Sequence, residues 1–289
     1  MNSSIKLALI TGPTSGIGQV FAYKLASQGY NLVLVARREK RLEHLAEQLE
    51  AKYEIKVEYL VADLSCEKDI DKVERYISSL SRIDLLVNNA GFGVAGFFME
   101  IPIEEQLRMV NVHLTSTVRF CKAVIPVMAQ RQKGYIINLA SFAAFMELPG
   151  SVMYATTKAA VIKFSQTLQS EVSGNGIKIQ ALSPGFTPTA FHSSIQRDVE
   201  FVDRVPRFLW TSIDEVVETS LSNIDRSRVI CVPGAVNSLL FWLNQSPLMS
   251  RLMQGVVKKY QKEQPEIVSE TKVIKEQESR ELSKELSLS

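Results

Sequence analysis

The stretch KLALITGPTSGIG, residues 6–18, predicts the first strand, loop and helix of the fold. A run of apolar and β-branched residues ends at Thr11, and Gly12, Gly16 and Gly18 follow where a helical pattern begins. Gly12 permits a tight turn, Gly16 leaves space for a phosphate group near the backbone, and Gly18 allows close packing of helix on strand. The helix N-terminus presents unpaired N–H groups to an anion. The stretch therefore favours a dinucleotide site over a purely structural turn.

The alternation of strand and helix continues along the chain. Short apolar runs occupy 6–11, 31–36, 56–62, 83–88, 135–140, 177–183 and 228–232, and helical periods occupy 16–28, 38–52, 67–80, 104–131, 154–173 and 212–224. Strands that read as nearly continuous apolar runs are buried on both faces, as in parallel sheets. We therefore predict an α/β, Rossmann-type doubly wound fold, with a parallel sheet of about seven strands and helices on both faces.

The pattern divides the chain into three parts. Residues 1–234 are predicted to form a single Rossmann-fold catalytic domain, in which the weakly periodic segment 184–211 forms a substrate lid. Residues 235–260 have the pattern of a C-terminal amphipathic helical extension, and the charged segment 261–289 that of a disordered tail. Four roles of the extension stay open, namely packing on the domain, closing a substrate channel, pairing subunits, and touching a membrane peripherally through 239–260. Packing or subunit contact is favoured over membrane contact.

Composition excludes several classes of partner. The 289 residues include 33 basic and 31 acidic ones, for a net charge of +2, which indicates no nucleic-acid partner. Cys66, Cys121 and Cys231 are far apart and odd in number, as expected for reduced thiols in the cytosol, and no metal site is expected. The N-terminus lacks the core of a secretory signal, and no apolar run reaches membrane-spanning length. We therefore expect a cytoplasmic location.

A second stretch, SVMYATTKAAVIKF at 151–164, indicates chemistry. Tyr154 and Lys158 are four residues apart and so share one face of the predicted helix. Such pairs often only cover a surface. The chemical interpretation is that the ammonium group lowers the pKa of the phenol from about 10 toward neutrality, where tyrosine can exchange a proton.

Six motifs in order resemble the short-chain dehydrogenase/reductase family. They are the T-G-x-x-x-G-x-G loop at 11–18, NNAG at 88–91, Asn111 in the next helix, Ser141 thirteen residues before Tyr154, the Y-x-x-x-K pair of Tyr154 and Lys158, and PGFTPT at 184–189. Thr187 stands where this family more often has valine or isoleucine. The resemblance extends from about residue 5 to 190, and more loosely to 234.

The resemblance implies a catalytic set of Asn111, Ser141, Tyr154 and Lys158. Tyr154 would be the general acid in carbonyl reduction, or the base in alcohol oxidation. Lys158 would lower its pKa and hold the nicotinamide ribose, while Ser141 would donate a hydrogen bond to the substrate oxygen. Asn111 would hold a water that links Lys158 to solvent.

The resemblance also implies a cofactor site. Its residues would be Gly12, Thr14, Ser15, Gly16, Ile17, Gly18, Arg37, Arg38, Asp63, Leu64, Asn89, Ala90, Gly91, Tyr154, Lys158, Pro184, Gly185, Thr187 and Thr189. At the end of the second strand Ala36 replaces a possible acid, and Arg37 and Arg38 follow at a helix N-terminus, where cations are unfavourable. This pattern predicts NADP(H) rather than NAD(H), with Arg37 as the main phosphate ligand. Asp63 would contact the adenine or cap the next helix.

The loops around this site are rich in large apolar residues. They are Phe92, Phe97, Phe98, Phe142, Met146, Phe186, Phe191, Phe208 and Trp210. Together they favour a small hydrophobic carbonyl or alcohol substrate, and the chain resembles the subgroup of broad ketone, 3-oxoacyl and 17β-hydroxysteroid-like reductases. NADP preference favours reduction of a ketone or aldehyde such as an acyl chain or a steroid-like compound. The resemblance further implies a homo-oligomer, either a dimer or a tetramer.

Three other functions stay open on the sequence. A non-catalytic NADP(H)-binding sensor would keep the fold but has no need of Tyr154. A scaffold would recruit a partner through the tail. An epimerase or dehydratase of the extended relatives is disfavoured, because those chains are longer and have a different glycine spacing in the first loop.

Overall fold

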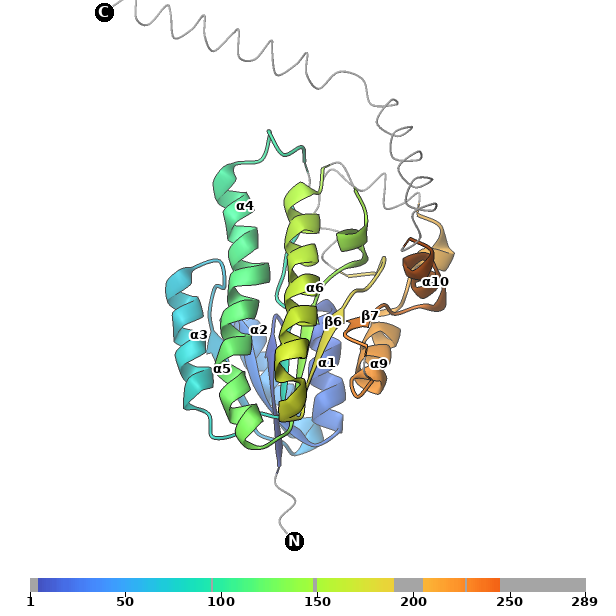
Figure 1. The fold of residues 1–289 in the computed structure, drawn as a ribbon. Coiled ribbons are helices and arrows are strands. Elements are labelled where there is room, and N and C mark those ends of the chain that lie inside the picture. The colour runs from blue at the N-terminus through green and yellow to red at the C-terminus, as the bar shows by residue number, and fades with distance from the viewer. Residues whose placement is uncertain (1–4, 95, 148–149, 190–204, 227, 245–289) are drawn as a thin grey trace, which may run out of the picture. The chain divides into compact units, whose positions relative to one another are not determined.

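The protein is described by a computed structural model that covers residues 5–94, 96–147, 150–189, 205–226 and 228–244. A seven-stranded sheet has the order β3-β2-β1-β4-β5-β6-β7 (Figure 1). The strands are β1 (Lys6–Thr11), β2 (Tyr30–Ala36), β3 (Val57–Val61), β4 (Leu85–Asn88), β5 (Gly134–Leu139), β6 (Ile177–Leu182) and β7 (Ile230–Cys231). The α-helices are α1 (Gly16–Ser27), α2 (Glu39–Tyr53), α3 (Glu67–Ser79), α4 (Ile103–Val110), α5 (Ser116–Gln130), α6 (Val152–Val172), α9 (Ile213–Asn223) and α10 (Ala235–Asn244).

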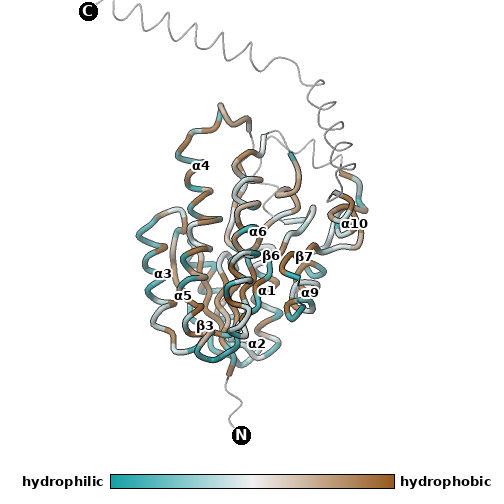
Figure 2. Tube along the Cα trace, in the orientation of Figure 1, coloured by the Kyte–Doolittle hydropathy of each residue, from teal (hydrophilic) through white to brown (hydrophobic). Residues whose placement is uncertain are grey.

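All strand pairs are parallel, and helices cover both faces of the sheet. Helices α1, α2 and α9 share one core cluster with alternate strand residues such as Ile10. Helices α3 and α5 share the other cluster with residues such as Leu9, and the N-terminal residues of β6 join it. Figure 2 shows the hydrophobic residues gathered along the strands and on the inner sides of the helices. The predicted fold class is confirmed.

The strand order reverses next to β1, which pairs with β2 on one side and β4 on the other. The chain therefore leaves β1 and β4 toward opposite faces of the sheet, which opens a crevice at their carboxyl ends. Ligands of open parallel sheets bind at such a switch point. The glycine loop after β1 and the NNAG segment after β4 meet there.

The segment 104–131, predicted as helical, is helical from Ile103 to Gln130 but changes its hydrogen-bond pattern in the middle. A π-helical turn, Asn111–Thr115, separates α4 from α5. The hydroxyl groups of Ser116 and Thr117 donate hydrogen bonds to main-chain oxygens of the π turn, to Val112 and His113 respectively, both at 2.8 Å. Single π turns inside α-helices often lie at functional sites.

The C-terminal part of the described chain packs on the domain. In α10 the side chain of Phe241 is buried, and Asn237 donates hydrogen bonds to the Leu209 main-chain oxygen and to Thr211 Oγ1. Residues 1–245 form one compact unit. The predicted extension beyond 244, the tail, and lid residues 190–204 lie outside the described residues. Within the described ranges, no helix is long and apolar enough to cross a membrane.

Candidate active site

The loop between β1 and α1 has the conformation that its glycines predict. Gly12 and Gly16 have φ angles of +67° and +58°, which other residues rarely adopt. A Cβ at Gly18 would lie 2.3 Å from Nδ2 of Asn89 and 2.4 Å from the Gly12 oxygen, so this helix start requires glycine. The N-cap Ser15 makes no side-chain hydrogen bond to α1 and so does not compete for its first N–H groups. The loop fits a bound phosphate group.

Hydrogen bonds tie this loop to the NNAG segment. Nδ2 of Asn89 donates to the main-chain oxygens of Thr11 at 2.9 Å and Gly12 at 3.0 Å. The Thr11 hydroxyl oxygen in turn accepts from the N–H groups of Asn89 at 3.0 Å and Ala90 at 2.9 Å. Two motifs that are more than seventy residues apart in sequence therefore form one rigid unit at the switch point.

The two arginines after β2 reach different partners. Arg38 donates a 2.8 Å hydrogen bond to Thr14 Oγ1 in the glycine loop. Arg37 is largely exposed, and its Nη1 lies 3.7 Å from Oδ2 of Asp63. Partial burial acts to raise the pKa of Asp63, but hydrogen bonds from Ser65 and the charge of Arg37 hold it below its usual value. The guanidinium groups lie beside the predicted adenosine contacts, where a 2′-phosphate would need them.

The P-G loop closes the other side of the crevice. The N–H of Phe142 donates a 2.9 Å hydrogen bond to the Pro184 oxygen, which links the loop after β6 to the end of β5. Gly185 lies against α10, because a Cβ there would be 2.6 Å from Nδ2 of Asn237. The Thr187 hydroxyl donates to the Gly185 oxygen at 3.2 Å, and Thr189 faces Gly16. The segment predicted to contact the cofactor thus lies opposite the glycine loop.

Ser141, Tyr154 and Lys158 come together as predicted. Ser141 follows β5, accepts a 3.2 Å hydrogen bond from the Ala143 N–H, and is also hydrogen-bonded to Tyr154. Lys158 is 3% exposed, and its Nζ donates a 2.7 Å hydrogen bond to the Leu139 oxygen. The same Nζ lies 5.9 Å from the centroid of the Tyr154 ring. In this arrangement the phenol of Tyr154 lies beside the hydroxyl group of Ser141 and can serve as a proton donor.

The pKa values of the pair differ from the prediction. Burial raises the pKa of Tyr154, and the hydrogen bond with Ser141 opposes that rise only in part. Burial lowers the pKa of Lys158 to about 7. The physical reason is that both groups lose water, which disfavours phenolate and ammonium alike, while the lysine donates to Leu139. In this structure the phenol is therefore held protonated at neutral pH.

Asn111 lies in the π turn but does not face Lys158. Its Nδ2 donates a 3.2 Å hydrogen bond to the Ser65 oxygen, and its Oδ1 accepts from Thr115 at 3.3 Å. Ser65 belongs to the loop that carries Asp63. The geometry thus joins Asn111 to the predicted cofactor loop, and its proposed water link to Lys158 stays a prediction.

A buried histidine beside the site was missed from the sequence. His113 is 2% exposed, and its Nε2 accepts the Phe92 N–H at 3.2 Å. Nδ1 therefore carries the proton and donates to Thr157 Oγ1 at 2.9 Å, and the Thr157 hydroxyl donates to the main-chain oxygen of Tyr154 at 3.0 Å. Burial, with help from the charge of Lys158, holds the pKa of His113 well below 6.5. The signal was a polar residue within the apolar run VNVHL, which requires buried partners.

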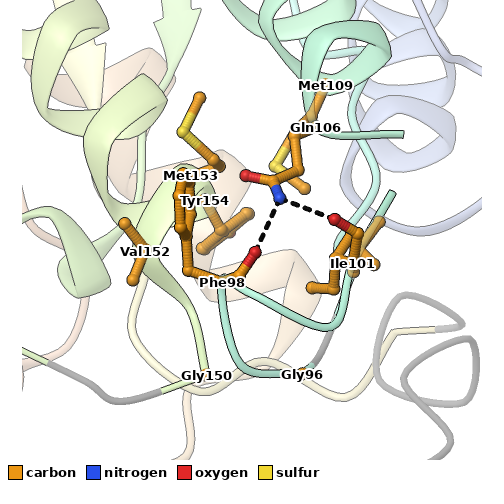
Figure 3. A pocket seen from close by; sticks show the side chains of 10 residues that line it. Gly96, Phe98, Ile101, Gln106, Met109, Gly150, Val152, Met153 and Tyr154 are labelled. Atoms are coloured by element: carbon orange, nitrogen blue, oxygen red, sulfur yellow. Dashed lines mark hydrogen bonds between the residues drawn. The ribbon is translucent and has the colours of Figure 1, made fainter. Parts of the chain in front are cut away.

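The large apolar residues of the loops that the structure describes are divided among several separate contacts. Phe98 lines a small pocket beside Tyr154, together with Met109, Val152 and Met153 (Figure 3). Phe142 contacts Phe145, which packs on Phe241 of α10, and Phe186 packs on Trp210. Phe92 contacts His113, Phe208 is 67% exposed, and Phe191 lies outside the described residues. The pocket next to Tyr154 is apolar, as predicted for this site.

Comparison with known proteins places this geometry in a family. The sequence model described as "short chain dehydrogenase" matches residues 6–200. A zebrafish (Danio rerio) protein, very-long-chain 3-oxoacyl-CoA reductase-B, is 31% identical over 256 residues, which cover 87% of this chain and 79% of the relative.

Two solved structures share the fold over most of the chain. A short-chain dehydrogenase from Sphingobium yanoikuyae in complex with NADPH is 31% identical, with a TM-score of 0.75, and the match covers 91% of this chain and 97% of that one. A bulky-bulky ketone specific alcohol dehydrogenase from Comamonas testosteroni is 29% identical, with a TM-score of 0.72 and coverage of 92% and 97%.

Proposed function

The chain belongs to the short-chain dehydrogenase family, and from that premise we propose that it reduces a hydrophobic ketone or aldehyde to an alcohol, with Tyr154 as general acid. It is an NADP-dependent oxidoreductase that acts on CH–OH and C=O groups. The observation that carries the proposal is the position of the Tyr154 phenol, which is hydrogen-bonded to Ser141, lies next to Lys158 and lines an apolar pocket.

The cofactor is NADP(H), and the residues present fit it. The left-handed glycines and the uncapped start of α1 would hold the pyrophosphate, and Arg37 and Arg38 the 2′-phosphate. Asp63, Leu64, the NNAG segment and the P-G loop would contribute further contacts to the cofactor. The bound nicotinamide would supply the hydride for reduction.

The chain's own groups would manage the proton and the charge. Tyr154 would donate its phenolic proton to the substrate oxygen, because burial keeps that proton in place at neutral pH. The Ser141 hydroxyl would donate a hydrogen bond to the same oxygen as negative charge develops there. Lys158, whose pKa is about 7, can take up or release a proton near neutrality and so help to return one to Tyr154.

The pocket supports an apolar substrate. Its side chains near Tyr154 include Phe98, Ile101, Met109, Val152 and Met153, none of which carries a charge. The reductases of 3-oxoacyl and bulky ketone compounds among the similar proteins agree with a hydrophobic acyl-chain or ring substrate. Cytoplasmic location and a homo-oligomeric state stay predictions.

The direct test follows NADPH consumption by the purified chain against aldehydes and ketones of increasing length and ring size. We expect turnover that grows with apolar bulk, and Tyr154→Phe should lower it by roughly 10²- to 10⁴-fold while leaving NADPH binding intact. Tyr135→Phe is a matched control, because the Tyr135 hydroxyl bonds Asp225 away from the site. NADPH binding without turnover on any carbonyl would instead favour the sensor function.

A further inference from the structure

One polar side chain in the apolar pocket has an unusual set of bonds. Gln106, on α4, is 4% exposed, and its Nε2 donates hydrogen bonds to the main-chain oxygens of Phe98 at 3.0 Å and Ile101 at 2.9 Å. These two acceptors use both amide hydrogens. A flipped amide would place its oxygen against two carbonyl oxygens, so the orientation of the side chain is determined.

The other end of this amide has no partner. Among the described residues, Oε1 of Gln106 is one of three buried side-chain atoms without a hydrogen bond. Figure 3 shows it pointing away from the Phe98–Ile101 loop, toward Met153 and Tyr154. An unmet buried acceptor destabilises a protein, and such atoms call for an explanation at the site where they occur.

The other side chains that line the pocket around this oxygen are mostly apolar. The two glycines of the pocket meet, since the Gly96 N–H donates to the Gly150 oxygen at 3.2 Å, and Gly96 has a φ of +147°. Met109 and Met153 are among its apolar lining residues. The lining thus combines adaptable apolar side chains with one fixed acceptor, which is the composition of a site that selects an apolar ligand by a single polar group.

We propose that Gln106 determines specificity by accepting, at Oε1, a hydrogen bond from a hydroxyl or amide N–H group that the substrate carries apart from its reacting carbonyl. This inference rests on the proposed carbonyl reduction at Tyr154. The preferred substrate is then a hydrophobic carbonyl compound with a second, donor-bearing group. A site built around a buried acceptor discriminates strongly against an analogue that lacks the donor, because the acceptor is left unpaired.

The test compares ketones that differ only in the donor. The probes are the three ring isomers of 4-(hydroxyphenyl)butan-2-one, their methyl ethers, and 4-phenylbutan-2-one. For at least one isomer, we expect kcat/KM of the wild-type chain to exceed that of its methyl ether by about tenfold or more. Equal values for every pair would overturn the proposal.

Two variants distinguish the role of the acceptor Oε1 from that of the hydrogen bonds that Nε2 donates to the Phe98–Ile101 loop. Gln106→Met removes the acceptor and these hydrogen bonds. Gln106→Glu keeps an acceptor oxygen but loses the N–H groups that donate to Phe98 and Ile101. We expect Gln106→Met to abolish the preference for the hydroxyl compound over its methyl ether, and Gln106→Glu to retain that preference. Met153→Leu, in the same pocket, should affect all probes alike. Equal losses on all probes in Gln106→Met would mean a purely structural role.

Binding gives the same comparison without turnover. Calorimetry of the probes on the NADPH complex of Tyr154→Phe should show tighter binding of the preferred hydroxyl compound than of its ether, and equal binding would overturn the inference. If the chain reduces 4-phenylbutan-2-one but shows no preference for any hydroxyl compound over its methyl ether, the proposed role of Gln106 is wrong and the proposed reduction is still supported. Donor-selective binding by a wild-type chain that reduces none of the ketones would remove the proposed reduction alone.

Discussion

Lys158 lies with its Nζ 5.9 Å from the centroid of the Tyr154 ring and donates its 2.7 Å hydrogen bond to a main-chain oxygen, not to the phenol. Both side chains lose water when the domain folds, and this loss is the main cause of both pKa shifts. Burial keeps the phenol protonated and brings the pKa of the amine to about 7. This state suits a proton donor in carbonyl reduction.

The pKa of Lys158 predicts how stability depends on pH. Because the folded protein releases this proton near pH 7 and the unfolded chain near 10.5, the unfolded state binds more protons between these values, and stability rises with pH. Between pH 7 and 8.5, Lys158→Met should remove a rise of at most about 1.4 kcal/mol per pH unit. Urea unfolding of the cofactor-free protein at several pH values measures it.

Between pH 7 and 8.5, the buried groups His113, Tyr154 and Cys121 contribute little to the pH dependence of stability. His113 contributes its pH dependence below 6.5, and the raised pKa values of Tyr154 and Cys121 act above their ordinary values of 10 and 9. The exposed Lys163 on the same helix gives a control, Lys163→Met. If Lys158→Met and wild type show parallel pH dependence from 7 to 8.5, the ammonium is not destabilised by burial.

Arg37 should select the phosphorylated cofactor. Charge-assisted hydrogen bonds to a 2′-phosphate contribute about 1.5–3 kcal/mol, so Arg37→Ala should weaken NADPH binding by roughly tenfold or more while NADH binding changes little. Fluorescence titration with both cofactors checks this, with the exposed Arg41→Ala as control. Equal losses for the two cofactors would contradict the assignment.

Arg38 should behave differently from Arg37. Its 2.8 Å hydrogen bond to Thr14 supports the glycine loop, which both cofactors use. Arg38→Ala is therefore expected to weaken NADPH and NADH together, with an additional loss for NADPH only if the guanidinium also reaches the 2′-phosphate. The same titration measures it, and an unchanged affinity for NADH would mean that the bond to Thr14 does not support the loop.

The hydrogen bonds of His113 should stabilise the helix that carries Tyr154. Thr157→Val keeps the shape of the side chain but leaves the His113 Nδ1–H unpaired, which should lower the free energy of unfolding by about 1–3 kcal/mol. Loss of the bond to the main-chain oxygen of Tyr154 should loosen the helical turn that positions this residue and so lower kcat more than it changes KM. The neighbouring exposed Thr156→Val should stay within about 0.5 kcal/mol of wild type. A Thr157→Val protein as stable as this control would refute the prediction.

Gly18 should not tolerate a side chain. The Cβ of Gly18→Ala would lie 2.3 Å from Asn89 Nδ2, so the glycine loop and the NNAG segment must separate, at a cost of about 1–3 kcal/mol. NADPH affinity should fall with stability. At Gly174 a Cβ would meet nothing within 4 Å, so Gly174→Ala is the control. Thermal unfolding with and without NADPH distinguishes the two effects, and wild-type affinity in Gly18→Ala would mean that the loop adapts.

Much of the fold was predictable because short-range patterns in the sequence encode its strands, helices and turns. Apolar runs such as that of Leu32–Val35 are buried on both faces of the sheet, and this leaves a signal in the sequence that needs no knowledge of contacts. The glycine loop and the Tyr154–Lys158 spacing are local in the same sense. Residues four apart on a helix share a face whatever surrounds the helix.

Tertiary structure alone decided the features that depend on distant partners. His113 finds Thr157 forty-four residues away, and no short pattern encodes that contact. The oxygen of Gln106 is left without a hydrogen bond only because the pocket closes around it, and the π turn at Asn111 was not predicted from the sequence. The sequence by itself thus determined the strand–helix alternation and predicted the residues of the site. The structure decided their protonation, because the pKa values of Tyr154 and Lys158 depend on how completely the assembled domain excludes water from them.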